Sequence, residues 1–343
     1  MSFFKMHGKR IGIDLGTESI LVVVRTKGII INEPAIIAIE KRTNDIVAVG
    51  NEAKEMIGKT PEKIEALRPL QHAGIANLKA TEMIIQDIIN RLKKTEEFSK
   101  PEVLINVHIG ITDLEKRAVF KAVLDSGVKD VCIIDEPLAA AYGANLDVNS
   151  PEGTMIIDLG SGTTEVAVIA LGEIVSSDSI KVAGDDLDQN IVDYVKKNMS
   201  VEIGKNAAEK IKKKLASAKP VLGKTIEVKG RDLVTGLPKT ITLNAFQVNE
   251  AIRGSFKKII EMIKSTLERT PPELIADIHK KGITLTGGCA YIDKIDELIS
   301  QRLGINVIVA DNPLECVALG IGKIIDNDEK MKELKLKRRR RYV

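Results

Sequence analysis

The stretch that decides the fold is Met155–Ile169, Met-Ile-Ile-Asp-Leu-Gly-Ser-Gly-Thr-Thr-Glu-Val-Ala-Val-Ile. It begins with a short apolar run and ends with a β-branched run, and both runs are typical of buried strands. Between them, Gly160–Thr164 is small and hydroxylated, so the backbone can turn tightly and approach an anion. A Walker A loop or a dinucleotide fingerprint would need a helix after the glycines. The stretch therefore predicts a strand–turn–strand unit that cradles phosphate, with Asp158 placed to hold hydrated Mg²⁺, although a plain β-hairpin explains it equally well.

A second copy of this pattern lies near the N-terminus. Residues 13–17, Ile-Asp-Leu-Gly-Thr, repeat residues 157–161, Ile-Asp-Leu-Gly-Ser, and at the same offset Gly28 falls on Gly172. Such an echo predicts two similar α/β halves. Two phosphate hairpins, each with one aspartate, would then form one nucleotide cleft between the lobes.

Composition excludes several classes of protein. The 343 residues carry a net charge of only +3, few aromatic side chains and no tryptophan, so a nucleic-acid reader that stacks bases is not expected. No segment approaches the roughly eighteen apolar residues that cross a bilayer. The three cysteines, Cys132, Cys289 and Cys316, are widely spaced and read as reduced thiols of a cytosolic protein.

Each half contains an insertion, at residues 32–68 and 180–245. Within the first insertion, residues 50–56 and 61–66 are predicted to be short helices. Elsewhere hydrophobic spacing predicts the framework elements. The predicted helices are residues 81–93, 113–124, 138–144, 187–197, 206–216, 246–269 and 313–325. The predicted strands are residues 10–13, 20–24, 28–31, 35–40, 46–49, 103–111, 131–134, 225–229, 239–243, 283–286 and 305–309.

Three further places carry candidate site residues, each with a plainer alternative. Glu136 precedes Pro137 at a predicted helix start, where it either points into a cleft or simply complements the helix dipole. Glu209 and Lys212 share a helix face, and a surface ion pair explains them as well. The pair at residues 287–288, Gly-Gly, allows backbone to lie against a planar base or allows tight packing.

The C-terminal segment Lys335–Val343 is a dense basic run that we expect to be disordered. Such clusters are attracted to anionic lipid by about 1 kcal/mol per basic side chain. A merely solvated tail and a nucleic-acid contact are the alternatives.

With these pieces assembled, residues 11–325 resemble the actin, chaperone and sugar-kinase ATPases, and among them most closely the MreB family of bacterial actins. Each motif is weak alone, but the ordered set is specific. The matching motifs are Asp-Leu-Gly-Thr at 14–17, Glu-Pro-Leu-Ala-Ala-Ala at 136–141, Asp-Leu-Gly-Ser-Gly-Thr-Thr-Glu at 158–165, Ala-Glu-Lys-Ile-Lys at 208–212 and Thr-Gly-Gly at 286–288.

The resemblance implies an actin-like ATPase fold of two duplicated lobes around a nucleotide cleft, each with a smaller inserted subdomain. It implies ATP and Mg²⁺ as cofactors. The implied phosphate-binding residues are Gly16, Thr17, Gly160, Ser161, Gly162 and Thr163. Glu209 and Lys212 would face the ribose and adenine, and Gly287 and Gly288 would flank the nucleotide. Asp14 and Asp158 would position Mg²⁺ through water, and Glu136 and Thr163 would orient the attacking water. The implied subdomains are IA at 8–31, 69–145 and 318–330, IB at 32–68, IIA at 146–179 and 246–317, and IIB at 180–245, followed by a basic tail at 331–343.

The same resemblance implies slow ATP hydrolysis coupled to a homopolymer of paired protofilaments on the cytoplasmic face of the cell membrane, for cell shape or motility. Membrane contact would use the basic tail and the side chains of Phe3, Phe4 and Phe98. One departure is Glu18, where family members usually carry a small or amide residue; a carboxylate there repels phosphate unless it points away. The rival functions are a small-molecule kinase of the same fold and a non-catalytic nucleotide-binding scaffold.

Overall fold

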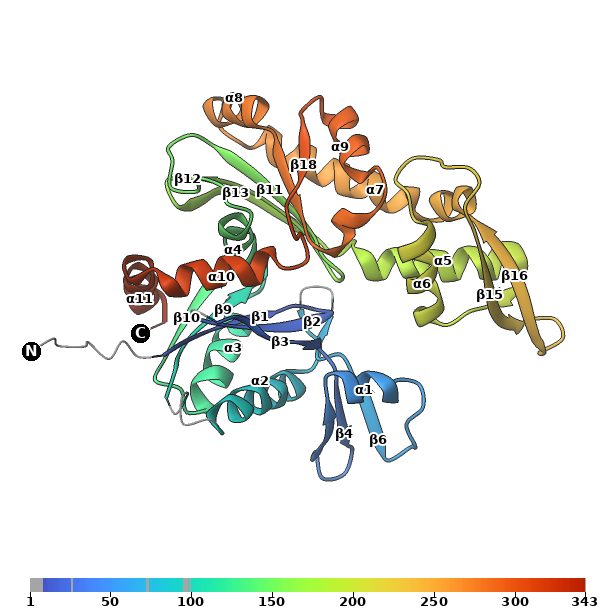
Figure 1. The fold of residues 1–343 in the computed structure, drawn as a ribbon, viewed down its shortest axis with the longest axis horizontal. Coiled ribbons are helices and arrows are strands. Elements are labelled where there is room, and N and C mark those ends of the chain that lie inside the picture. Colours follow the sequence, from blue (N-terminus) through green and yellow to red (C-terminus); the bar gives the residue numbers. More distant parts are fainter. Residues whose placement is uncertain (1–8, 26, 72–73, 95–97, 99, 343) are drawn as a thin grey trace, which may run out of the picture. The chain divides into compact units, whose positions relative to one another are not determined.

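The computed structural model divides the chain into two compact units, each built around a five-stranded sheet with helices (Figure 1). The first unit comprises residues 1–147 and 315–343, and the second comprises residues 148–314. The residues that the structure describes are 9–25, 27–71, 74–94, 98 and 100–342.

The sheet of the first unit has β1 (Arg10–Leu15) at its centre, in the order β10-β9-β1-β2-β3. On one side, β1 pairs antiparallel with β2 (Ser19–Val24), which pairs antiparallel with β3 (Gly28–Pro34). On the other side, β1 pairs parallel with β9 (Glu102–Val107), which pairs parallel with β10 (Asp130–Asp135).

The sheet of the second unit repeats this scheme around β11 (Thr154–Leu159), in the order β13-β12-β11-β17-β18. β12 (Thr164–Ala170) and β13 (Glu173–Ile180) follow as antiparallel neighbours. β17 (Ile283–Thr286) and β18 (Val307–Val309) extend the other side in parallel. The shared scheme confirms the duplication that the repeated motif predicted.

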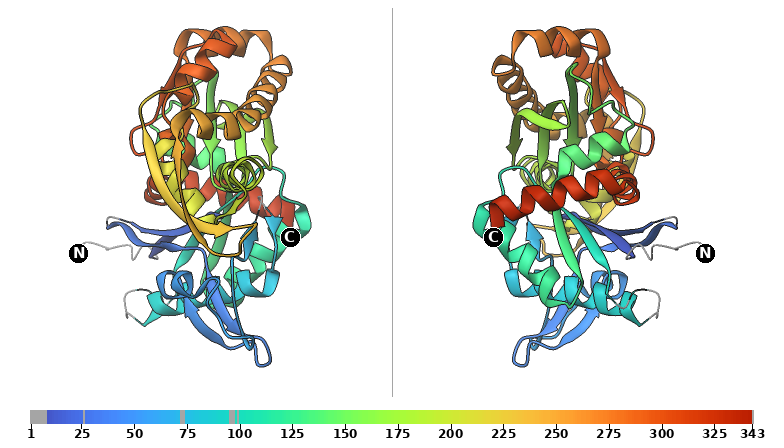
Figure 2. Two further views of the ribbon diagram at one scale, coloured as in Figure 1. Left: turned by 90° about the vertical axis from the view of Figure 1, so that its right-hand side faces the viewer. Right: turned by 90° about the vertical axis from the view of Figure 1, so that its left-hand side faces the viewer.

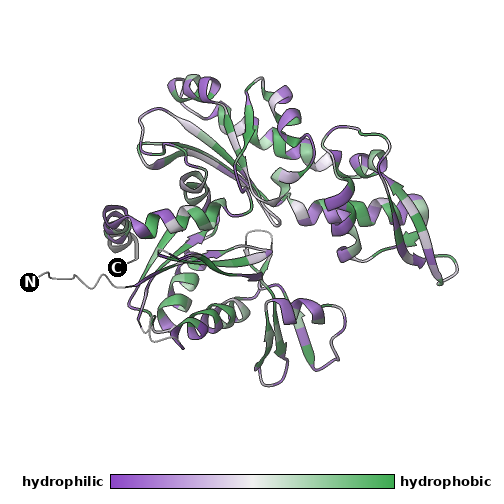
Figure 3. Ribbon diagram, in the orientation of Figure 1, coloured by the Kyte–Doolittle hydropathy of each residue, from purple (hydrophilic) through white to green (hydrophobic). Residues whose placement is uncertain are grey.

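Two helices cover one face of the first sheet, whose strands β1 and β9 are buried along their whole length. α2 (Leu78–Lys93) and α3 (Asp113–Asp125) bury isoleucines and valines in one cluster with Ile11 and Ile13 of β1. Figure 3 shows these strands as predominantly hydrophobic. In a strand, side chains two apart share a face, so the intervening residues of β1 point to the opposite side.

That opposite face is covered by α4 (Glu136–Gly143) and α10 (Cys316–Asp326), which pack against one another. A Cβ added to Gly12 of β1 would lie 2.2 Å from Cγ2 of Ile321, so α10 rests directly on the strand. α10 lies alongside α4 in the views of Figures 1 and 2.

In the second unit, the helices bury one face of the sheet in a single hydrophobic cluster that includes Met155 and Ile157. The helix α8 (Pro272–Lys281) was not predicted from the sequence, although Pro272 begins it and suits a first helical turn. The helices are α7 (Ala245–Glu268), α8 (Pro272–Lys281) and α9 (Ile295–Leu303).

The first insertion corrects one prediction, because residues 61–66 do not form a helix. Ile64 and Ala66, two residues apart, pack on a small cluster with Ile36 and Ala38, which is the spacing of a strand. The insertion consists of β4 (Ile37–Glu40), β5 (Ile46–Val49), α1 (Asn51–Met56) and β6 (Ile64–Leu67), followed by the small hairpin of β7 (Leu70–Gln71) and β8 (Gly74–Ile75).

The second insertion places two helices beside a three-stranded sheet of order β14-β15-β16. Its elements are α5 (Gly184–Met199), β14 (Val201–Glu202), α6 (Lys205–Leu215), β15 (Thr225–Asp232) and β16 (Pro238–Asn244).

The C-terminal segment is helical and not disordered as predicted: α11 runs from Asp328 to Tyr342. Met331 and Leu334 are buried, and Nζ of Lys335 lies 2.9 Å from the Glu102 carboxylate, so side chains of its first half hold the helix on the first unit. Figure 3 shows α11 as mostly hydrophilic. None of the helices in the described part of the chain is long and apolar enough to span a membrane.

Candidate nucleotide site

The two repeated turns have the same backbone geometry. N of Gly16 donates to O of Ser19 at 3.0 Å, and N of Gly160 donates to O of Thr163 at 3.0 Å. A Cβ on either glycine would lie 3.0 Å from the same carbonyl oxygen that its own N–H contacts. The duplication therefore extends from the strand order to the turn that was predicted to bind phosphate in each unit.

In the first unit, Asn106 brings two of the predicted site residues together. Its Nδ2 donates to Oδ1 of Asp14 at 3.0 Å and to Oε2 of Glu136 at 2.8 Å. Nδ1 of His108 lies 2.9 Å from the same Oε2. Asp14 lies near the end of β1, Asn106 lies on the neighbouring strand β9, and Glu136 begins α4. The structure thus joins the predicted metal-positioning and water-orienting carboxylates through one buried amide.

The electrostatics of this cluster favour a cation. Burial, and after it the nearby Glu136 carboxylate, raise the pKa of Asp14 to about 8, although His108 and the hydrogen bond from Asn106 act in the opposite direction. A buried carboxylate is costly unless an opposite charge or hydrogen bonds offset it. A divalent cation would favour the ionised form of Asp14.

Thr17 contributes an unsatisfied hydroxyl in the same unit. The residue is buried, and its Oγ1 has no hydrogen-bond partner within the described part of the chain. Buried hydroxyls normally have a partner, so this oxygen fits contact with a ligand such as a phosphate.

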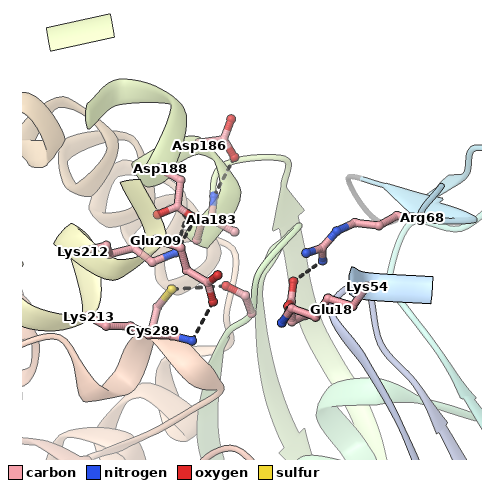
Figure 4. A network of polar contacts seen from close by, with 12 residues as sticks. Glu18, Lys54, Arg68, Ala183, Asp186, Asp188, Glu209, Lys212, Lys213 and Cys289 are labelled. Carbon is pink, nitrogen blue, oxygen red and sulfur yellow. Dashed lines mark hydrogen bonds and ion pairs between the residues drawn. The ribbon is translucent and has the colours of Figure 1, made fainter. Parts of the chain in front are cut away.

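The negative charge of Glu18 is balanced by two basic side chains. Its carboxylate pairs with the guanidinium of Arg68 and lies 3.5 Å from Nζ of Lys54, as Figure 4 shows. Both partners belong to the first unit. The repulsion that the sequence suggested is therefore offset by two cations.

In the second unit, the turn after β11 is tied to the start of α5. N of Gly184 donates to O of Gly160 at 3.2 Å, and N of Asp185 donates to O of Ser161 at 2.8 Å. Asp158, at the end of β11, is buried, as is Thr163 in the turn. The predicted residues Asp158, Gly160, Ser161, Gly162 and Thr163 thus form one continuous strand end and turn.

Lys212 and Glu209 of α6 do not form an ion pair with each other, because each pairs with a different residue. Nζ of Lys212 lies 2.8 Å from Oδ2 of Asp188 and donates to O of Gly184 at 2.8 Å. Glu209 pairs with Lys213 at 2.6 Å. Burial raises the pKa of Asp188 to about 6 even though the neighbouring Lys212 acts to lower it. Figure 4 shows Lys212 extending from α6 towards α5.

Close packing requires a glycine at position 287. Of the two interpretations of the glycine pair, this favours tight packing over contact with a planar base. The φ of Gly287 is 85° and its ψ is 166°. A Cβ there would lie 2.3 Å from Oδ1 of Asp158 and 2.4 Å from O of Leu159. Gly288 begins a short 3₁₀ helix, η2 (Gly288–Tyr291), and has more room, since its nearest neighbour would be Cδ2 of Leu314 at 3.1 Å.

Cys289 also belongs to this region, although the sequence predicts only that it is a reduced thiol. Its Sγ lies 3.3 Å from O of Gly160, and Figure 4 shows it near Lys212. Burial raises the pKa of the thiol to about 11, so it remains protonated at neutral pH. Its position directly after the glycine pair is the signal that links it to the site.

Asn106 and His108 were likewise missed. Both interrupt the apolar run at residues 103–111, with Asn106 on β9 and His108 directly after the end of that strand. Two polar residues spaced by two in an otherwise apolar run are the signal that could have identified them.

The predicted membrane contact through Phe98 is wrong in this structure, because its side chain is only 4% exposed. It packs beneath Nζ of Lys9 and Lys27, which lie 5.6 and 5.8 Å from the ring centre. Phe3 and Phe4 lie outside the described residues.

Comparison with known proteins gives a match to the MreB/Mbl protein family over residues 8–333. The cell shape-determining protein Mbl of Bacillus subtilis strain 168 is 44% identical over 332 residues, which cover 96% of this chain and 100% of Mbl. The cell shape-determining protein MreB of Escherichia coli strain K12 is 40% identical over 330 residues, covering 94% of this chain and 95% of MreB. The crystal structure of MreB5 of Spiroplasma citri bound to AMPPNP superposes with a TM-score of 0.89 at 33% identity, covering 96% of this chain and 99% of MreB5.

Proposed function

This chain belongs to the MreB/Mbl protein family, and on that premise we propose that it is an actin-like, cell shape-determining cytoskeletal protein that binds and slowly hydrolyses ATP as it polymerises. The fold, the duplicated turns and the relatives named above support the proposal. The division into subdomains IA, IB, IIA and IIB with the boundaries given above is part of it.

The nucleotide contacts follow the resemblance residue by residue. Gly16 and Thr17 of the first unit and Gly160–Thr163 of the second bind phosphate through backbone N–H groups and hydroxyls. Lys212 and Glu209 contact the ribose and adenine, and Gly287 and Gly288 flank the nucleotide. The unsatisfied hydroxyl of Thr17 supports this assignment.

The observation that carries the proposal is the Asp14–Asn106–Glu136 cluster, in which one amide holds two carboxylates together. Asp14 of this cluster, together with Asp158 of the second unit, would position Mg²⁺ through water, and Glu136 is held beside it for the attacking water. When bound, Mg²⁺ neutralises charge on the phosphates and so favours transfer of the γ-phosphoryl group.

Glu136 orients the attacking water together with Thr163. Both contacts of the Glu136 carboxylate use Oε2. We assign the hydrogen bond from water to Oε1, because the contacts with Asn106 and His108 both use the other oxygen. Because His108 and Asn106 fix the other oxygen, the carboxylate is held in one orientation.

Phosphate release tests the catalytic part of the proposal. Glu136→Ala removes the water-orienting group, and we expect phosphate release to fall about a hundredfold while nucleotide binding persists. Asp125→Ala, which removes an exposed carboxylate at the end of α3, is the matched control and should release phosphate at the wild-type rate. Unchanged release by Glu136→Ala would contradict the assigned role.

The same experiment separates the rival functions. Transfer of phosphate to an added sugar or other hydroxyl compound, in place of water, would identify a small-molecule kinase. Nucleotide binding with no phosphate release from the wild-type protein would identify a non-catalytic scaffold.

Filaments of paired protofilaments, formed on the cytoplasmic face of the cell membrane, complete the proposal. The basic sequence at the end of α11 supports attraction to anionic lipid, and Phe3 and Phe4 would add apolar contact. Sedimentation with vesicles tests this part. We expect binding to vesicles that contain phosphatidylglycerol and loss of binding after removal of residues 337–343; equal binding to neutral vesicles would contradict an electrostatic contact.

A further inference from the structure

Asn106 holds the first-unit cluster together, and we propose that it is a positioning residue that sets Asp14 and Glu136 for metal and water. This inference rests on the proposed function, since it assigns a role within the same site. It concerns a side chain that no sequence motif singled out.

The sheet register explains why Asn106 reaches both carboxylates. Ile13 of β1 pairs with Ile105 of β9, so Asp14 and Asn106 follow as neighbours on adjacent strands. Both isoleucines lie in the hydrophobic cluster under α2 and α3, which turns the next residue of each strand to the opposite face. Glu136 follows β10, the other neighbour of β9, and therefore begins its helix beside Asn106.

The amide uses both of its donors and its acceptor oxygen in this position. Its two N–H groups can each serve one carboxylate, at 3.0 and 2.8 Å, and Oδ1 accepts from N of Leu15 at 2.8 Å. The opposite amide orientation would turn a carbonyl oxygen towards two carboxylates and leave the Leu15 N–H facing a donor. The network therefore fixes the orientation.

One side chain thus connects three parts of the site. Its donors offset the repulsion between Asp14 and Glu136, which neither carboxylate can relieve by itself. Its acceptor holds N of Leu15, the residue directly before the Gly16–Thr17 turn. Asn106 is only 1% exposed, so in the folded protein water does not replace these bonds.

Asn106→Leu tests the proposal, because leucine is of similar size and lacks the donors and the acceptor. The full chain is titrated with a fluorescent ATP analogue, first across a range of Mg²⁺ concentrations and then in EDTA. We expect the Mg²⁺ concentration for half-maximal effect on nucleotide binding to rise about tenfold, as is usual when a group that orients metal-binding residues is lost. Binding in EDTA reports separately on the Gly16–Thr17 turn, which loses the acceptor for N of Leu15, and it should weaken less than binding at limiting Mg²⁺.

Asn249→Leu is the matched control. Asn249 is a buried asparagine of α7 whose Nδ2 donates to O of Ser217 at 2.9 Å, and it contacts none of the predicted site residues. This control should leave the Mg²⁺ dependence at the wild-type value. If Asn106→Leu fails to fold by circular dichroism, Asn106→Ser, which keeps one donor, should show a smaller shift in the same direction.

The outcomes distinguish failure of the positioning role of Asn106 from failure of the proposed function. A wild-type Mg²⁺ dependence in a folded Asn106 variant would overturn the positioning role while leaving nucleotide binding intact. A shift of equal size in Asn249→Leu would also overturn it, because the effect would then be general to buried amides. A wild-type protein that binds no nucleotide would overturn the proposed function and this inference with it.

Discussion

Gly287→Ala places a methyl group where the second unit has no room for one. The added Cβ would lie 2.3 Å from Oδ1 of Asp158 and 2.4 Å from O of Leu159. The second atom is backbone in the central strand of the sheet, so rotation of a side chain cannot relieve the clash. The change therefore strains the β11–β17 pair and displaces a predicted metal-positioning carboxylate.

Two costs contribute to the expected loss of stability. The backbone at Gly287, with φ 85° and ψ 166°, is a region that residues with a Cβ adopt at a cost of about 2 kcal/mol. Overpacking of a close contact costs about 2 kcal/mol more. We expect Gly287→Ala to lower the free energy of unfolding by about 4 kcal/mol and to weaken nucleotide binding.

Gly236→Ala separates the two contributions. Gly236 also has a positive φ, 74°, but a Cβ there would meet nothing within 4 Å. Its cost should be only about 1 kcal/mol. Urea unfolding followed by circular dichroism gives both values, and hydrogen exchange in β11 and β17 locates the effect. If Gly287→Ala costs no more than Gly236→Ala, the packing argument is refuted.

Two further predictions concern the first unit. The pKa of Asp14 is raised from 3.8 to about 8, so its contribution to stability is present at low pH and is lost as pH rises from about 4 to about 8. In magnesium-free buffer, Asp14→Asn should gain stability relative to the wild type across that window by urea unfolding, and a pH-independent difference would contradict the assignment. Lys335→Ala removes ion pairs with Glu102 at 2.9 Å and Asp130 at 3.6 Å, so α11 should lose about 1 kcal/mol of protection in hydrogen exchange. Protection of α11 that is unchanged would show that Met331 and Leu334 hold the helix without this ion pair.

The framework was predictable because its signals are local and repeated. The echo of residues 13–17 at 157–161 predicted two equivalent halves, and the strand order and the Gly16 and Gly160 turns agree. Pro137 similarly marked the first turn of α4. In each case the chain carries the information within a few residues.

Other features depend on partners that are distant in the sequence. The role of Asn106 depends on strands β1 and β10, which pair with β9 on either side and bring Asp14 and Glu136 beside it. The repulsion expected between Glu18 and phosphate is offset because Arg68 and Lys54, which are distant in the sequence, form ion pairs with Glu18. Neither relation is visible in local spacing.

The wrong predictions have the same origin. Residues 61–66 read as a helix because so short a segment has no clear period, and pairing with β4 made part of it a strand. The basic C-terminal segment was predicted disordered from its charge, but Met331, Leu334 and Lys335 attach its first half to the first unit. Phe98 is predicted to contact the membrane because it is apolar, but its side chain is buried beneath Lys9 and Lys27.

Nucleotide-dependent assembly tests the central claim most directly. The pure protein is centrifuged with ATP, with ADP and without nucleotide, while phosphate release is recorded and the pellet is imaged by electron microscopy. We expect paired filaments in the ATP sample, with slow phosphate release that accompanies assembly. Steady ATP turnover by a protein that never pellets would contradict the cytoskeletal account and favour a kinase of the same fold.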